Sequence, residues 1–251
     1  MIQPLLAAFA ALDWPTLALV CGGAFVGALA AGGAGFAFGT MASAVWLHGL
    51  APLQVTALVV GCGAFLHCIL VWPIRRDISP AKLWPYLAGG ALGIPLGVLT
   101  LTRLNGGGLK LGLGAFLILY GVYALAAPRL PAMARKGRAA DAVVGFIGGL
   151  MGGIGGYSGI APTIWTQMLH MPKAEARGIY QPFILLAQVS TLLLVGALAL
   201  DARTLALMLS TLPALLAGSA AGWAIYGRLD EAGFKKLLAG LLLLSGVTLV
   251  V

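Results

Sequence analysis

Apolar stretches of about twenty residues, each bounded by a turn or a charge cluster, follow one another along almost the whole chain. A helix needs about 20 predominantly apolar residues to cross the hydrocarbon core of a bilayer. Only 9% of the 251 residues are charged and 61% are hydrophobic, whereas a soluble domain carries roughly 25% charged residues. The pattern excludes a soluble globular domain and predicts an all-α, polytopic helical bundle embedded in a lipid bilayer.

The apolar stretches form two sets of five, read from turn and charge signals. A basic linker with two prolines separates the sets at 128–138. We therefore expect a first transmembrane repeat at 1–127, the linker at 128–138 and a second repeat at 139–251. The expected segments are 15–33, 35–50, 53–73, 82–102 and 108–126, then 141–155, 157–170, 176–198, 204–226 and 233–250.

The two sets share residues in the same order, which indicates an internal repeat of the kind found in many transporters. Because each repeat holds five segments, an odd number, the second copy is expected to lie upside down relative to the first. The first two segments of each repeat are short, so each pair is either two crossings or a re-entrant hairpin. At an offset of 120, Gly32, Gly33, Gly35, Gly39 and Pro52 fall on Gly152, Gly153, Gly155, Gly159 and Pro172.

The basic residues lie between apolar stretches and not along one helix face, so they favour membrane orientation over a nucleic-acid partner. Twelve of the fifteen lie on the side of the linker, and only Arg103, Lys110 and Arg203 lie on the other. The positive-inside rule then places the linker in the cytoplasm and both termini outside the inner (plasma) membrane. Cys21, Cys62 and Cys68 lack disulfide or metal-ligand spacing, so neither a metal nor a cofactor is expected.

Two glycine-rich clusters interrupt apolar segments at matching places in the repeats. Matched breaks of this kind point to a substrate site near the bilayer midplane, and the N-terminus of the segment that follows offers N–H groups to an anion. The alternative is close helix packing through small residues. The clusters supply the substrate-binding candidates Gly32, Gly33, Gly35 and Gly39, and Gly152, Gly153, Gly155 and Gly156.

Polar side chains near these breaks are the other substrate-binding candidates. Hydroxyls that follow the breaks either donate to an anion or bond to their own helix backbone. Polar residues on one face of the segment after Pro172 line a pathway, snorkel to the interface or bridge helices. His67 is expected to be a packed, hydrogen-bonded residue. The candidates are Thr40, Ser43, Tyr157, Ser158 and Thr163 near the breaks, and Arg177, Gln181, Gln188 and Thr191 after Pro172.

A glycine-rich turn opening each repeat, a proline about a dozen residues later and two repeats of this length resemble the TauE/SafE family of sulfite and sulfonate exporters. The resemblance covers nearly the whole chain. It implies a membrane transporter whose partner is a small sulfur-containing anion.

Two other function classes were weighed. Gly156-Tyr157-Ser158-Gly159 resembles the motif of rhomboid intramembrane proteases, but a nucleophilic serine needs a positioned base and Phe38 occupies the matching position of the first repeat. No catalytic residue is therefore expected. A non-transporting membrane scaffold is the second alternative. All seven acidic residues fall at segment ends, which disfavours a cation or proton site at the membrane centre. We expect export of the anion by alternating access, with the oligomeric state left open.

Overall fold

The computed structural model describes residues 2–34, 37–103, 106–126 and 137–226, together with residues 240, 243, 246, 247 and 250. Regular secondary structure in these residues is entirely helical. The helices are α1 (Ile2–Ala10), α2 (Trp14–Ala34), α3 (Phe38–Trp46), α4 (Pro52–Ile74), α5 (Pro80–Arg103), α6 (Gly106–Ala126), α7 (Arg138–Gly155), α8 (Ile160–Met168), α9 (Lys173–Ala199), α10 (Ala202–Ser210) and α11 (Leu212–Tyr226).

Within the described residues, five helical stretches are long and apolar enough to cross a membrane: Trp14–Gly32, Pro52–Ile74, Pro80–Arg103, Lys173–Gly196 and Ala202–Ala224. Large apolar side chains on their outer faces and on α6 are exposed, for example Leu92, Leu119 and Leu193 at 69%, 71% and 75%. Such a surface suits lipid tails and not water. The prediction of an all-helical, multi-pass membrane protein is confirmed.

Several predicted boundaries differ from the observed ones. The segments expected at 35–50 and 157–170 shrink to α3 and α8, which have nine residues each and reach only about 14 Å at 1.5 Å per residue. The segment expected at 204–226 divides at Thr211 into α10 and α11, because Pro213 lacks an N–H and its ring crowds the carbonyl four residues earlier. Most of the linker and of the segment expected at 233–250 lies outside the described residues.

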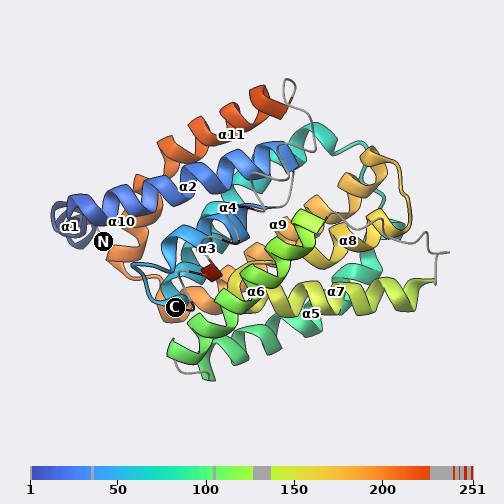
Figure 1. Cartoon of the computed structure of the whole chain (residues 1–251), viewed down its shortest axis with the longest axis horizontal. Coiled ribbons are helices and arrows are strands. Elements are labelled where there is room, and N and C mark those ends of the chain that lie inside the picture. The colour runs from blue at the N-terminus through green and yellow to red at the C-terminus, as the bar shows by residue number, and fades with distance from the viewer. Residues whose placement is uncertain are drawn as a thin grey trace.

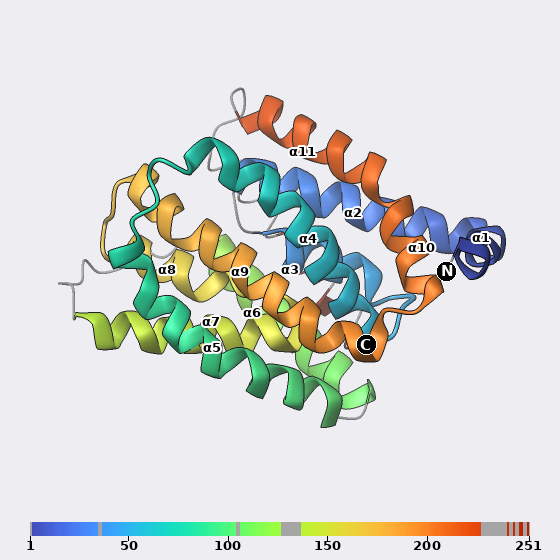
Figure 2. The ribbon, with the colours of Figure 1, turned by 180° about the vertical axis from the view of Figure 1, so that it is seen from behind.

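The helices lie in layers. The pair α2 and α11 forms one edge, α5 and α7 form the opposite edge, and α4 and α9 lie between them (Figures 1 and 2). Glycines allow the edge pairs to pack backbone against backbone. A Cβ at position 149 would lie 2.7 Å from the Gly90 carbonyl oxygen, and a Cβ at position 32 would lie 2.7 Å from that of Ser219.

Each short helix returns along the long helix before it. The indole nitrogen of Trp46, at the end of α3, donates to the Val20 carbonyl near the start of α2 over 3.0 Å. In the pair α7–α8, the indole nitrogen of Trp165, in the second half of α8, donates to Asp141 at the start of α7 over 2.9 Å, and Tyr86 on α5 donates to the same oxygen. Both pairs are therefore helical hairpins: the first hairpin is α2–α3 and the second hairpin is α7–α8.

Candidate functional site

The second hairpin turns at a glycine whose backbone fixes the break. Gly156 has φ +79°, a left-handed conformation that favours glycine. Its N–H donates to the Gly152 carbonyl over 2.7 Å, and the Tyr157 N–H donates to the Met151 carbonyl over 3.3 Å. The first of these bonds, from the left-handed glycine to the carbonyl four residues earlier, is a usual glycine-terminated ending of a helix, so the sequence at 151–157 ends α7 by local chemistry.

The two hairpin tips meet beside α4. A Cβ at position 39, in the first turn of α3, would lie 2.8 Å from the Gly156 carbonyl oxygen and 3.2 Å from Val59 Cγ1. Thr56, one turn earlier on α4, donates its hydroxyl to the Ile154 carbonyl over 3.0 Å. The glycine-rich breaks, 117 residues apart between Gly39 and Gly156, are thus brought into direct contact.

Buried oxygens without a hydrogen-bond partner among the described residues lie on both hairpins and on α9, the segments next to this meeting point. Phe183 of α9 approaches Gly148 beside Ser158. Buried polar atoms are nearly always paired, so their concentration here points to a ligand or solvent that binds between the helices. This polar cluster consists of Ser43 Oγ, Tyr157 Oη, Ser158 Oγ, Thr163 Oγ1, Gln181 Oε1, Gln188 Oε1 and Thr191 Oγ1.

Individual contacts order the polar cluster. The Tyr157 hydroxyl faces the Ser43 side chain across the two hairpins. A Cβ at position 152 would lie 3.0 Å from Ser158 Cβ, and a Cβ at position 63 on α4 would lie 2.8 Å from Gln188 Cδ. Gly152 and Gly63 therefore leave space for polar side chains of the cluster. This role cannot be read from the sequence, because it depends on which segments pack against each glycine.

The predicted glycines divide into two groups. Gly32 and Gly153 lie against the backbones of α11 and α5, where a Cβ would be 2.7 Å from Ser219 O and from Val98 N. These positions support the alternative interpretation of Gly32 and Gly153, in which they allow close packing of helices. Gly39, Gly152, Gly155 and Gly156 lie at the meeting point of the tips. Gly33 is in the last turn of α2, and Gly35 lies outside the described residues.

The start of α8 offers few backbone donors. The Ile160 N–H donates to the Tyr157 carbonyl over 3.3 Å, and Pro162 has no N–H. The N-terminus of α8 therefore has little to offer an anion.

Three other predicted residues have local roles. The Thr40 hydroxyl donates to the Ala37 carbonyl over 3.0 Å. It therefore bonds to nearby backbone, which is the alternative to donating to an anion. His67 is fully buried and its Nδ1 lies 2.9 Å from the Gly63 carbonyl oxygen, as expected for a packed histidine. Arg177 is half-buried one turn before Gln181 near the start of α9.

Sequence reasoning missed the burial of Asp141. This carboxylate is fully buried, and its Oδ1 accepts hydrogen bonds from Tyr86 Oη and Trp165 Nε1, both at 2.9 Å. Its hydrogen-bond donors come from α5 and α8, so the residues next to Asp141 in the sequence do not indicate that it is buried. Asp141 precedes Gly155 by fourteen residues, about 21 Å along α7, and the polar cluster itself contains no carboxylate.

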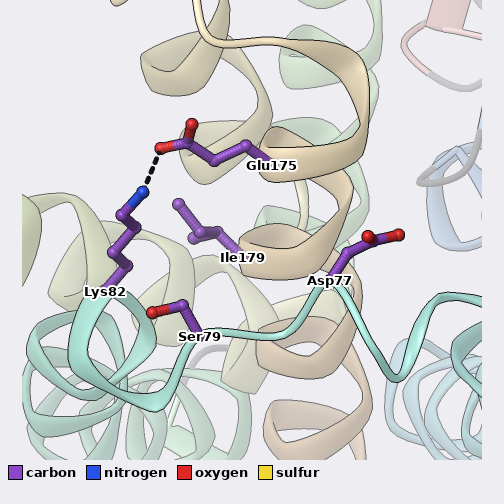
Figure 3. Close-up of a pocket in the computed structure, with 5 residues that line it drawn as sticks. All are labelled: Asp77, Ser79, Lys82, Glu175 and Ile179. Carbon is purple, nitrogen blue, oxygen red and sulfur yellow. Dashed lines mark hydrogen bonds and ion pairs between the residues drawn. The ribbon is translucent and has the colours of Figure 1, made fainter.

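Two cavities lie at opposite ends of α5. The α5–α6 cavity, of about 240 Å³, lies between α5, α6 and α7 and is lined by Thr100, Gly112, Phe116, Met151, Ile154 and Tyr157 among others. The α5–α9 pocket, also of about 240 Å³, is lined by Asp77, Ser79, Lys82, Glu175 and Ile179. In the pocket, Lys82 Nζ and Glu175 Oε1 are 2.9 Å apart, while the Asp77 carboxylate points away from them (Figure 3).

Comparisons with known proteins agree with this architecture. A family model described as sulfite exporter TauE/SafE matches residues 19–249. No curated protein and no solved structure matches the chain. Within the described residues, no group of three or more His, Cys, Asp or Glu side chains is placed to hold a metal ion.

Proposed function

The chain belongs to the TauE/SafE family of sulfite exporters, and from that premise we propose that it exports sulfite or a related small sulfonate by alternating access. The family is one of membrane transporters and not of enzymes. The observation that carries the proposal is the meeting of the two hairpin tips beside buried hydroxyl and amide groups, with no carboxylate among them.

The chemistry of the polar cluster favours an anion. An isolated charge in an apolar interior is very costly unless donors or opposite charges compensate it. Hydroxyls and the NH2 groups of the glutamines donate to oxyanion oxygens, and a helix N-terminus adds a positive partial charge. A cation at the same place would lack the acidic ligands that cation sites use.

We further propose that the fold consists of two inverted repeats, α2–α6 and the part of the chain from α7 onward. The support is that contacts between helices recur at equivalent positions. A residue of α5 is equivalent to the residue 129 positions later in α11, and a residue of α2 is equivalent to the residue 117 positions later in α7. Gly89 meets Ala142 as Gly218 meets Phe25, Gly93 meets Phe146 as Gly222 meets Leu29, and Gly149 meets Gly90 as Gly32 meets Ser219.

The shift of 117 differs from the 120 read from the glycines. In helix packing Gly32 corresponds to Gly149 and not to Gly152. The difference of three residues is nearly one helical turn, so α7 continues about one turn further than α2 before its break. This extra turn at the end of α7 brings Gly156 to the side of α4, where its carbonyl faces Gly39 and its Cα faces Val59.

The orientation follows from charge. With twelve of fifteen basic residues on its side, the linker is assigned to the cytoplasm and the termini to the periplasm of an inner membrane. An Arg135→Cys variant, in a background with all three native cysteines replaced, tests this assignment. Labelling by an impermeant thiol reagent is expected only after the cells are opened, and labelling of intact cells would reverse the orientation.

Alternating access has structural support in the two cavities. The α5–α6 cavity reaches Tyr157 at the second tip, while the far end of α5, about 27 Å away along the helix from Thr100 to Lys82, is joined to α9 by the Lys82–Glu175 ion pair. This arrangement fits a state that is closed on the linker side. Relative movement of the hairpins would exchange the open and closed sides.

The decisive experiment is efflux of sulfite from proteoliposomes under an imposed membrane potential without a pH gradient. A negative interior drives an anion outward by about 2.3 kcal/mol per charge per 100 mV, so efflux should rise with the potential. Parallel assays with sulfate and sulfoacetate rank the substrates. A protein that transports none of these anions favours the scaffold alternative. Efflux that follows only a pH gradient contradicts transport driven by the membrane potential alone.

A further inference from the structure

The described lining of the α5–α6 cavity is mostly apolar. Among the described residues that line it, Thr100 and Tyr157 carry polar side-chain atoms. The Thr100 hydroxyl donates to its own helix at the Leu96 carbonyl over 2.9 Å, and the Tyr157 hydroxyl belongs to the polar cluster, where it faces Ser43. The described wall of the cavity therefore offers an anion little before it reaches the polar cluster.

Tyr157 stands between the cavity and the polar cluster. Its ring forms part of the cavity wall and stacks on Phe116 with ring centres 5.4 Å apart. Its hydroxyl belongs to the cluster, and the side chain is only 4% exposed. One residue thus closes the cavity with its apolar ring and presents its polar end to the substrate site.

The backbone around Tyr157 favours movement of the ring as a unit with the tip. A Cβ at position 155 would lie 2.7 Å from Tyr157 Cζ, so Gly155 leaves the space that the ring occupies. The residue before Tyr157 is the left-handed Gly156, and Tyr157 lies between α7 and α8, outside both helices. A change in the angle of the second hairpin would carry the ring away from Phe116 and open the cavity to the cluster.

We propose that Tyr157 is the size-selecting gate of the transporter: its ring admits small anions from the α5–α6 cavity to the polar cluster and excludes bulky ones. This inference rests on the proposed function. When the ring moves away from Phe116, on which it now stacks, we expect the gap between Phe116 and the tip to admit a group as small as sulfite. A sulfonate with a bulky apolar substituent is rejected by size and not by charge.

The test compares efflux of sulfite and of benzenesulfonate from proteoliposomes at the same imposed potential. Replacing the ring by a methyl group in Tyr157→Ala should raise the benzenesulfonate-to-sulfite flux ratio at least about tenfold, the scale on which pocket size discriminates substrates. Tyr157→Phe keeps the ring and should keep the ratio, while lowering sulfite flux through loss of the hydroxyl. Leu113→Ala enlarges the same cavity away from the gate and should leave the ratio unchanged.

The outcomes separate the gate from the proposed function. Wild-type protein that moves neither anion overturns the proposed function and the gate with it. Wild-type sulfite efflux together with an unchanged ratio in Tyr157→Ala overturns the gate alone. If Tyr157→Ala does not fold, as judged by size-exclusion chromatography, Tyr157→Trp decides the matter: a lower ratio supports the gate, and an unchanged ratio refutes it.

Discussion

The indole N–H of Trp165 donates to Oδ1 of Asp141 over 2.9 Å, which ties the return helix of the second hairpin to the start of its long helix. Tyr86 on α5 donates to the same oxygen. Asp141→Ala removes the acceptor of the buried Tyr86 hydroxyl and of the half-buried Trp165 indole, and leaving a buried donor unpaired costs about 1–3 kcal/mol. We expect a clear fall in the melting temperature in detergent and loss of transport.

Asp141→Asn is the matched variant, because it keeps a side-chain oxygen at the same position while removing the negative charge. It should retain most of the thermal stability that the alanine variant loses. If the two variants are equally unstable, the charge of Asp141 and not its hydrogen bonds to Tyr86 and Trp165 stabilises the hairpin.

Gly153 tests the division of the glycines into packing and tip positions. Its hydrogen faces the backbone of α5, where a Cβ would lie 2.7 Å from Val98 N. Gly153→Ala should therefore separate α5 from α7 and destabilise the protein by about 1–3 kcal/mol, as overpacking does. Gly22→Ala on α2 has no atom within 4 Å of the added Cβ and should be neutral or slightly stabilising. Equal melting temperatures for the two variants would contradict this assignment.

The sequence predicted the membrane class, the helix pairs and the breaks because these depend on local properties: apolar length, glycine and proline. It also named Ser43, Tyr157, Ser158 and Gln188, which do belong to the polar cluster. It did not distinguish Gly153 from Gly156, since a packing glycine and a turning glycine look alike until the neighbouring helix is known. The burial of Asp141 was missed for the same reason, because its donors are 55 and 24 residues away.

The Lys82–Glu175 ion pair joins the start of α5 to the start of α9. Both side chains are about one-third exposed, at 38% and 33%, so the pair should contribute no more than about 1 kcal/mol to stability. If the pair holds the linker side closed, Glu175→Lys should change the rate of transport far more than the melting temperature. The double variant Lys82→Glu with Glu175→Lys should restore the rate. Failure of the double variant to recover any transport would contradict an effect through the pair.

Asp201 lies outside the membrane-spanning stretches and makes the stability of α10 depend on pH. Its Oδ1 accepts the Thr204 N–H over 2.7 Å at the start of α10, and the hydrogen bonds from Thr204 lower the pKa of this carboxyl below its usual 3.8. A lowered folded-state pKa stabilises the protein above the unfolded-state pKa and loses that effect as the pH falls through the folded-state value.

Asp201→Ala should therefore cost about 1 kcal/mol at neutral pH, the usual effect of losing a cap, and less below about pH 4. Asp201→Asn keeps an acceptor without a titrating group, so it should be milder and independent of pH over this range. Thermal unfolding in detergent at several pH values measures both. A pH-dependent loss in the asparagine variant would mean that another group is titrating.

Gln188 tests whether the polar cluster serves transport or only structure. Its side chain fills the space left by Gly63, where a Cβ would lie 2.8 Å from Gln188 Cδ. Leucine has a similar size, so Gln188→Leu keeps the packing between α4 and α9 but replaces amide donors with an apolar surface. Sulfite flux should fall about tenfold, which corresponds to about 1.4 kcal/mol of lost interaction, and Gln181→Leu should act in the same direction.

The melting temperature of Gln188→Leu should stay near that of wild type, because the Gln188 Oε1 has no protein partner in the described structure to lose. Gln54→Leu is the matched control. Gln54 lies near the start of α4, away from the α9 residues of the cluster, and its Nε2 is 3.5 Å from Oγ1 of Thr204 on α10. A fall in melting temperature with unchanged flux would make Gln188 a bridge between helices. A fall in flux with an unchanged melting temperature places its amide on the path of the anion.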